Sequence, residues 1–309
     1  MPLPPISTIH RQLTILLKDR FSQLRLAFPK FPLLLTIARL DRPIGIYLLL
    51  WPTLWGLWVA NEGYPGFHLF AVFVLGTVLT RSAGCVINDI ADRNFDGQVK
   101  RTVNRPLANG DLEIADAFIF LFVLLFLALV LVLTTNLLTL GLAVIAAFIA
   151  AIYPLMKRYT YLPQAVLGLA FSMGIPMAFS ATTGEVPQIA WLMLIANLIW
   201  TVAYDTQYAM IDRDDDLKLG LKSSAILFGD LDKPIIGVLQ IAFIWIMVMI
   251  GQRLELSIFF YFGLTLAVAL LIYQQYLIKD RDRDRCFASF LNNHWVGLAI
   301  FSGIFLHYF

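Results

Sequence analysis

The stretch NDIADRNFDG, residues 88–97, places acidic side chains directly after a long apolar run. Asn88, Asp92 and Asp96 are spaced by four residues, and four residues advance a helix by about 400°, so the three side chains share one face. Like charges stacked in this way repel one another unless a cation lies opposite them. Mg²⁺ supplies such a charge and prefers a few carboxylates together with waters and substrate phosphates. The motif therefore indicates a divalent metal site, and a solvated loop whose acids fall four apart by chance is the alternative.

A second acidic motif occurs in YDTQYAMIDRDDDLKLG, residues 204–220. Its segment from Asp212 to Asp216 repeats the D-R-x-x-D pattern found from residue 92 to residue 96. Tyr208 takes the place of the asparagine in the first motif, and Asp205 lies about one turn further back. This internal similarity predicts two related halves whose acidic helix ends face each other across a cavity.

Basic residues follow both motifs. They are Lys100, Arg101 and Arg105 after the first motif, and Lys218 and Lys222 after the second. Two metal ions held between acidic helix ends would bind a ligand rich in anionic oxygens, and neighbouring Lys and Arg side chains would neutralise its remaining charge. A diphosphate has this chemistry. Because the motifs adjoin membrane-length apolar segments, we expect a lipid with a diphosphate head group.

The composition is that of a membrane protein. The chain has 309 residues, of which 59% are hydrophobic and 14% are charged, whereas soluble domains carry roughly 25% charged residues. Apolar stretches of about 20 residues are long enough to cross a bilayer as helices. The sequence predicts an all-α polytopic membrane protein with nine transmembrane helices, at 44–61, 66–87, 114–134, 137–156, 162–180, 188–204, 234–251, 255–278 and 289–308.

The distribution of basic residues predicts the orientation in the membrane. If residues 1–43 are cytoplasmic, the loops at 88–113, 157–161, 205–233 and 279–288 are cytoplasmic as well. Of the 23 Lys and Arg residues, only Arg253 then falls on the outer side, which is the positive-inside pattern. Both acidic motifs are expected on the cytoplasmic side, and the C-terminal residue Phe309 on the outer side. The two cysteines, Cys85 and Cys286, form neither a disulfide framework nor a zinc site.

Residues 1–36 form a basic N-terminal extension. Its apolar residues recur at helical spacing among Arg and Lys, which favours an amphipathic helix lying on the membrane surface. A disordered basic tail is the alternative. The apolar positions are Ile9, Leu13, Leu16, Leu17, Phe21 and Leu24.

From about residue 37 to the C-terminus the chain resembles the UbiA superfamily of intramembrane aromatic prenyltransferases. The similarity rests on NDxxDxxxD, YDTxYAxxDxxDD and the flanking KRTVNRPLANG. Two further stretches, RLDRPIGIYLLLWPTLWGLW at 39–58 and KSSAILFG at 222–229, are most similar to the ubiquinone-pathway 4-hydroxybenzoate polyprenyltransferases. The extension 1–36 is not part of this pattern, so we expect one membrane domain over 37–309.

The resemblance implies a nine-helix bundle with a central cavity and a cytoplasmic cap. We expect a bacterial inner membrane, with a mature mitochondrial form as the alternative. The resemblance also implies Mg²⁺-dependent transfer of a polyprenyl group from polyprenyl diphosphate to the carbon ortho to the hydroxyl of 4-hydroxybenzoate, with release of diphosphate, in ubiquinone biosynthesis. By position, the implied metal ligands are Asn88, Asp92, Asp96, Asp212 and Asp216. The other implied site residues are Asp205 and Tyr208 of the second motif, Arg158, and the diphosphate-side cations Lys100, Arg101, Arg105 and Lys222.

The acceptor pocket is less well defined. The carboxylate of 4-hydroxybenzoate needs a cationic partner, and Arg39 and Arg42 stand at the start of the first apolar segment. Both residues are also explained as anchors at the membrane edge. Two other functions stay open: a sister prenyltransferase acting on haem or a naphthoate, and a divalent-cation transporter. A transporter needs ionisable residues at the membrane midplane. Here the acids gather at one face, and the outer half of the expected helix bundle is almost uncharged, which argues against a transporter.

Overall fold

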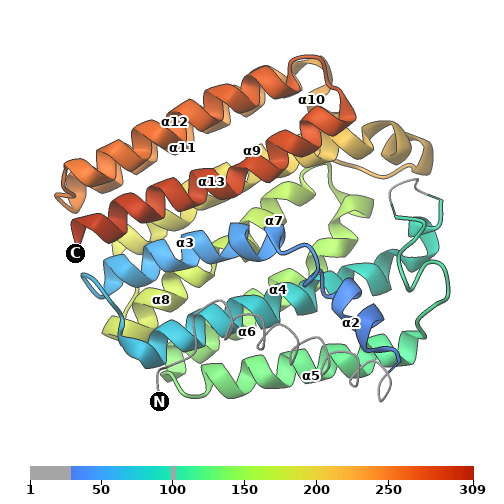
Figure 1. The fold of residues 1–309 in the computed structure, drawn as a ribbon, viewed down its shortest axis with the longest axis horizontal. Coiled ribbons are helices and arrows are strands. Elements are labelled where there is room, and N and C mark those ends of the chain that lie inside the picture. The colour runs from blue at the N-terminus through green and yellow to red at the C-terminus, as the bar shows by residue number, and fades with distance from the viewer. Residues whose placement is uncertain (1–28, 99–101) are drawn as a thin grey trace, which may run out of the picture.

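The computed structural model describes residues 29–98 and 102–309, and within these ranges the chain is helical without any strand. The predicted all-α fold is confirmed. Figure 1 shows the long helices running side by side, with the C-terminus at the left-hand end. The helices are α2 (Phe31–Ile37), α3 (Ile44–Ala60), α4 (Gly66–Asp96), α5 (Ile114–Val132), α6 (Leu137–Tyr159), α7 (Pro163–Ser172), α8 (Gly174–Thr183), α9 (Gln188–Leu219), α10 (Ser224–Phe228), the 3₁₀ turn η1 (Gly229–Leu231), α11 (Asp232–Arg253), α12 (Ile258–Ile278) and α13 (Arg283–His307).

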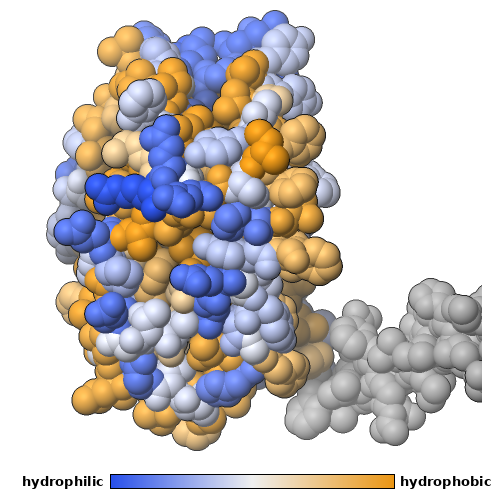
Figure 2. Space-filling model, turned by 90° about the vertical axis from the view of Figure 1, so that its left-hand side faces the viewer, coloured by the Kyte–Doolittle hydropathy of each residue, from blue (hydrophilic) through white to orange (hydrophobic). Residues whose placement is uncertain are grey.

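The described residues contain seven helical segments that are long and apolar enough to cross a membrane. The pair α7–α8 counts as one of them, and so does the stretch from α10 through α11. The apolar helix α3 has only 17 residues, and α13 carries Asn292, Asn293 and His294 in its middle; neither belongs to the seven. Length and composition thus indicate a multi-pass membrane protein. Figure 2 shows the end that carries the C-terminus, where hydrophilic residues are mixed with hydrophobic ones.

Two helices are longer than a membrane requires. Helices α4 and α9 have 31 and 32 residues, which corresponds to about 46–48 Å at 1.5 Å per residue. The hydrocarbon core of a bilayer is only about 30 Å thick. Both acidic motifs lie on the last turns of these helices, at the end of the bundle opposite the C-terminus (Figure 1). The excess length therefore carries the motifs beyond the most apolar part of the bundle.

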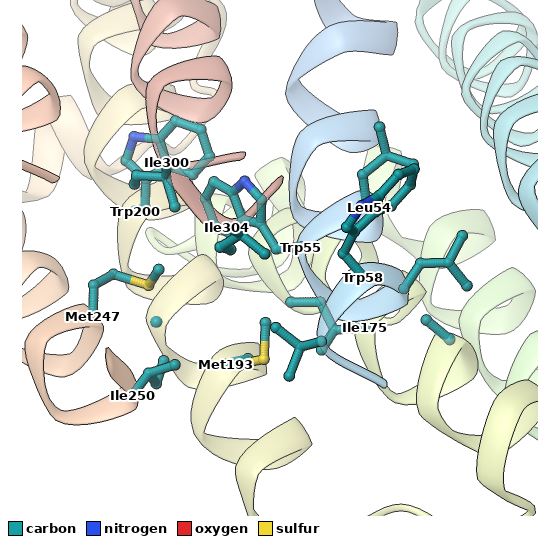
Figure 3. Close-up of a cluster of buried hydrophobic side chains, with 14 of the residues drawn as sticks. Leu54, Trp55, Trp58, Ile175, Met193, Trp200, Met247, Ile250, Ile300 and Ile304 are labelled. Carbon is teal, nitrogen blue, oxygen red and sulfur yellow. The ribbon is translucent and has the colours of Figure 1, made fainter. Parts of the chain in front are cut away.

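A cluster of buried aromatic and aliphatic side chains holds α3, α9, α11 and α13 together (Figure 3). Trp55 of α3 stacks on Trp200 of α9 with ring centroids 5.5 Å apart, and Trp200 stacks on Phe243 of α11 at 5.4 Å. Both indole N–H groups have acceptors on α13, since Trp55 donates to the Gly297 carbonyl at 3.1 Å and Trp200 to the Asn293 amide oxygen at 3.0 Å. Buried tryptophans with satisfied N–H groups fix the neighbouring helices in one arrangement.

The short helix α2 packs on α4 through Leu33, Leu34 and Ile37, beside Ala83 and Val86. Part of the predicted N-terminal extension therefore belongs to the bundle. The predicted amphipathic helix within that extension, at residues 9–24, lies outside the described residues. The boundary at residue 36 stays a prediction.

Close packing of α12 against α13 depends on Gly263. A Cβ atom at this position would overlap the backbone carbonyl oxygen of Ala299, which cannot move without shifting α13. We expect Gly263→Ala to destabilise the bundle by about 1–3 kcal/mol and to lower its melting temperature in detergent. Gly141→Ala on α6 is the matched control, because nothing lies within 4 Å of a Cβ there. Equal melting temperatures for the two variants would contradict the packing interpretation.

Candidate active site

Both acidic motifs lie on the wall of one cavity of about 1210 Å³. Helix α4 contributes Asn88, Asp92 and Asp96, and α9 contributes Asp212 and Asp216. The i, i+4 spacing has the predicted consequence, because each motif presents successive turns of one helix face to the same space. Asp205 and Tyr208 line the cavity from deeper turns of α9.

Asp92 is the most informative residue of the first motif. Its side chain is nearly inaccessible to solvent, and one carboxylate oxygen, Oδ2, accepts a short hydrogen bond from Lys157 of α6. The other oxygen, Oδ1, is buried without a hydrogen-bond partner. An unsatisfied buried carboxylate oxygen is costly unless a ligand completes it. An Mg²⁺ ion held at this end of the cavity would do so.

Arg105 and Arg39 are held by carboxylates at the first motif. Arg105 lies 2.7 Å from Asp96 and 3.0 Å from Asp89. Arg39 donates from one nitrogen to both oxygens of Asp89, at 2.9 and 3.0 Å. Asp89 is fully buried between them. The sequence did not mark Asp89 as a site residue, because one residue after Asn88 a helix has turned by about 100°. Through these two ion pairs, Asp89 holds the loop that contains Arg105 and the turn before α3 against α4.

The second motif divides into two sets. Asp212 and Asp216 line the cavity, whereas Asp214 and Asp215 form ion pairs with Arg283 of α13, each at 3.1 Å. These pairs tie the last turns of α9 to the start of α13.

Lys222 and Arg158 take different positions. Lys222 lines the cavity, while its ammonium group donates to the Tyr159 carbonyl at 3.2 Å and lies 5.2 Å from the Tyr161 ring. Arg158 is not among the cavity-lining residues; it donates to the Ala91 carbonyl of α4 at 3.0 Å, and its guanidinium lies 5.2 Å from the centroid of the Phe95 ring. Its neighbour Lys157 reaches the acids instead, because consecutive helical residues point in different directions. Lys100 and Arg101 lie outside the described residues.

Arg81 and Tyr153 also line the cavity and were not predicted. Arg81 lies on α4, where its Nη1 is 2.7 Å from the Cys85 sulfur and its Nε has no hydrogen-bond partner. Arg81 shares the cavity wall with Asp205 and Tyr153. Gly45 makes room for it, because a Cβ there would come within 2.5 Å of Nε. An arginine inside an apolar run is a functional signal that a sequence can give.

Much of the rest of the cavity is apolar. Its wall between α5 and α6 consists mainly of aliphatic and small side chains, with the hydroxyls of Thr135 and Thr139 near one end. The aliphatic and small side chains include Leu125, Leu129, Val132, Ala143, Ala147 and Ala151. Apart from Arg81, the charged groups are thus gathered toward one end of the cavity and hydrocarbon toward the other, as an amphiphilic ligand requires.

The acids do not form a closed metal cage. Among the described residues, no group of three or more His, Cys, Asp or Glu side chains is arranged to hold one ion. Mg²⁺ commonly binds through one or two carboxylates and completes its octahedron with waters and substrate phosphates. The residues present, with the unpartnered oxygen of Asp92 among them, fit an ion of this kind.

Comparison with known proteins gives a consistent assignment. The model of the UbiA prenyltransferase family matches residues 49–298. A curated relative from Pseudomonas fluorescens (strain Pf0-1), named 4-hydroxybenzoate octaprenyltransferase, is 55% identical over 272 residues, which cover 88% of this chain and 92% of the relative.

Solved structures share the fold. A UbiA homolog from Aeropyrum pernix K1, in its apo form, superposes with a TM-score of 0.75 at 23% identity, covering 85% of this chain and 97% of that one. A UbiA homolog from Archaeoglobus fulgidus, bound to GPP and Mg²⁺, gives a TM-score of 0.64 at 17% identity, covering 86% and 99%. The family match and the relative at 55% identity together establish that the chain belongs to the UbiA prenyltransferase family.

Proposed function

We propose that this protein transfers a polyprenyl group from polyprenyl diphosphate to 4-hydroxybenzoate, in ubiquinone biosynthesis. The observation that carries the proposal is the single cavity, with two acidic motifs at one end and an apolar wall at the other. The name of the relative from Pseudomonas fluorescens supports 4-hydroxybenzoate as the acceptor rather than haem or a naphthoate. A lipid diphosphate fits such a cavity with its head among the charges and its tail along the apolar wall.

The residues proposed to hold Mg²⁺ are Asn88, Asp92, Asp96, Asp212 and Asp216. When bound, the metal supplies positive charge that stabilises the departing diphosphate. Lys157, Arg105 and Lys222 line the same end of the cavity and bring further positive charge to it. Lys100 and Arg101 are proposed to join them from the segment that the structure does not describe. For Arg158 we propose no contact with the substrates, because it lies outside the cavity.

In the proposed reaction the bond between the allylic carbon and the diphosphate oxygen breaks, and the electron pair leaves with diphosphate. The ring carbon ortho to the hydroxyl forms the new carbon–carbon bond and then loses its proton, which the released diphosphate takes up in the overall balance. Asp205 and Tyr208 lie one to two turns deeper than Asp212, where the ring would meet the allylic carbon. Aromatic faces along the cavity, such as those of Phe171 and Phe290, stabilise developing positive charge, and the apolar wall excludes water that would quench it.

We further propose that nine helical spans cross the bacterial inner membrane, with a cytoplasmic N-terminus and an outer C-terminus. Each of the nine predicted spans coincides with a helix or a helix pair of the structure. The acidic end of the cavity then faces the cytoplasm, and the connections after α4 and α9 cap it. Residues 37–309 act as one membrane domain in this proposal.

Expression in a bacterium that lacks its own 4-hydroxybenzoate prenyltransferase tests the function in a membrane. The chain is expected to restore ubiquinone, detected by mass spectrometry of lipid extracts. The Asp92→Asn variant, expressed to the same level, is the matched control and should not restore it. Absence of ubiquinone from cells with the wild-type protein in their membranes would contradict the proposal.

The acceptor carboxylate is proposed to meet Arg42 rather than Arg39. Arg39 is engaged by Asp89, whereas the side chain of Arg42 is 81% exposed at the mouth of the cavity, with Asp41 at 3.8 Å. Contacts of exposed charges are worth about 0.2–1 kcal/mol.

Arg42→Ala should therefore raise the KM for 4-hydroxybenzoate by about two- to fivefold and leave kcat unchanged. Steady-state kinetics with varied concentrations of 4-hydroxybenzoate measure this effect. The control is Arg285→Ala at the start of α13, outside the cavity, which should leave the KM unchanged. An unchanged KM would return Arg42 to the role of a membrane-edge anchor.

A further inference from the structure

A cluster of ion pairs around one buried carboxylate lies outside the cavity, next to the second acidic motif. Its centre is Asp232, the first residue of α11, whose side chain is fully buried and is not among the cavity-lining residues. Asp232 accepts a hydrogen bond from the backbone N–H of Lys233 at 2.7 Å. A buried carboxylate is costly unless cations and hydrogen bonds surround it.

Arg281, in the connection between α12 and α13, supplies most of that compensation. Its Nε donates to Oδ2 of Asp232 at 2.9 Å and its Nη2 donates to Oδ1 at 2.8 Å, which is a two-point contact. These hydrogen bonds raise the pKa of Arg281 above its ordinary value, so its guanidinium stays charged. Arg281 has a φ of +54°, a backbone conformation that residues other than glycine rarely adopt unless their surroundings hold them there.

The second cation of the cluster belongs to the motif itself. Arg213 directly follows Asp212 on α9, and its Nη1 lies 3.6 Å from Oδ2 of Asp232. The same nitrogen donates to the Gly229 carbonyl at 3.4 Å. Because Arg213 is rotated by about 100° from Asp212, it is held outside the cavity while Asp212 and Asp216 line it. These two contacts link Arg213, and with it the last turns of α9, to the start of α11.

We propose that Asp232 and Arg281 are positioning residues for the second acidic motif. By holding Arg213, they fix the direction in which Asp212 and Asp216 face the metal and the diphosphate. This inference rests on the proposed function, and it assigns a task to a cluster that touches neither substrate. The ion pairs of Arg283 with Asp214 and Asp215 support the same segment from α13.

Asp232→Asn tests the proposal, because asparagine keeps the shape of the side chain and removes its charge. Loss of a residue that orients metal ligands typically weakens metal affinity by about 10- to 100-fold. We expect the Mg²⁺ concentration for half-maximal activity to rise by about tenfold, with the KM for 4-hydroxybenzoate unchanged. Binding of radiolabelled geranyl thiodiphosphate, titrated with Mg²⁺, should show the same shift without turnover.

The matched control is Asp280→Asn, which removes an exposed aspartate from the same connection and should leave the Mg²⁺ titration unchanged. Arg213→Met is the second variant: it breaks the link to α9 while Asp232 and Arg281 stay paired, and it should give the same tenfold shift. Folding of every variant is checked by its melting temperature in detergent.

The two levels of the proposal fail in different ways. If the wild-type protein binds geranyl thiodiphosphate without any dependence on Mg²⁺, the proposed function is contradicted. If the wild-type protein requires Mg²⁺, but Arg213→Met and Asp232→Asn reach half-maximal activity at the same Mg²⁺ concentration as the wild-type protein, the positioning role is overturned. The cluster is then only structural. A lowered melting temperature alone does not count as support.

Discussion

Asp92→Asn is expected to lower kcat/KM for the prenyl diphosphate by about a thousandfold while the protein still folds. Removal of one electrostatic group that stabilises developing charge commonly costs a factor of about 10²–10³, and Asp92 is proposed both to bind the metal and to hold Lys157. Asparagine keeps the side-chain shape and one oxygen, so packing around α4 is preserved. The loss should therefore come from the missing charge at the buried, unpartnered Oδ1 position.

Kinetics with geranyl diphosphate at saturating Mg²⁺ and acceptor measure this effect, together with the melting temperature of the variant. Asp116→Asn is the control, since Asp116 pairs with Lys30 at 2.7 Å at the start of α5, away from the cavity. That variant should retain the activity of the wild-type protein. Near-normal activity of Asp92→Asn at saturating Mg²⁺ would refute the metal assignment.

Asp212→Asn should cause a loss of similar size, although it lies on a different helix. Asp92 and Asp212 line the same cavity, and in the proposed mechanism they act on one diphosphate. Residues that act as a unit are strongly non-additive. The kcat/KM of the double variant is therefore expected to lie within about tenfold of that of the less active single variant. The measurement is kcat/KM for the two single variants and the double variant under identical conditions. If the two losses multiply instead, the motifs act independently and the shared-diphosphate interpretation is wrong.

Much of the helical architecture could be predicted because apolar length dictates it. The predicted span 44–61 corresponds to α3 at Ile44–Ala60, and 114–134 corresponds to α5 at Ile114–Val132. The predicted span 188–204 marks only the apolar part of α9, which continues to Leu219. The last turns of α9 are polar, so hydropathy does not mark them as helical. The i, i+4 spacing of the acidic motif is the feature of the sequence that indicates a helix there.

The single predicted span 162–180 is divided in the structure into α7 and α8 at Met173. Gly174 starts the second part, where a Cβ would overlap the Thr53 hydroxyl on α3. Two residues on, Pro176 has no N–H to donate to the carbonyl of Ser172, the last residue of α7, so the helical hydrogen bonds are interrupted at this point. Hydropathy along one segment contains no information about it.

The same limit applies to the site. The spacing of the acids placed Asp92 and Asp96 on one helix face, which the cavity wall reflects. The partner of Asp92 is Lys157, 65 residues away, and nothing in the sequence separates Lys157 from Arg158 as the residue that turns inward. Asp89 was likewise concealed, because its role depends on two arginines brought to it by loops.

A prenyl-transfer assay on the detergent-purified protein tests the central claim most directly. The mixture contains geranyl diphosphate, Mg²⁺ and 4-hydroxybenzoate, with EDTA and acceptor-free controls, and mass spectrometry detects the product. We predict 4-hydroxybenzoate geranylated on the carbon ortho to its hydroxyl, formed only when Mg²⁺ is present. Folded protein that yields neither this product nor free pyrophosphate would contradict the claim that the two acidic motifs form a prenyl diphosphate site.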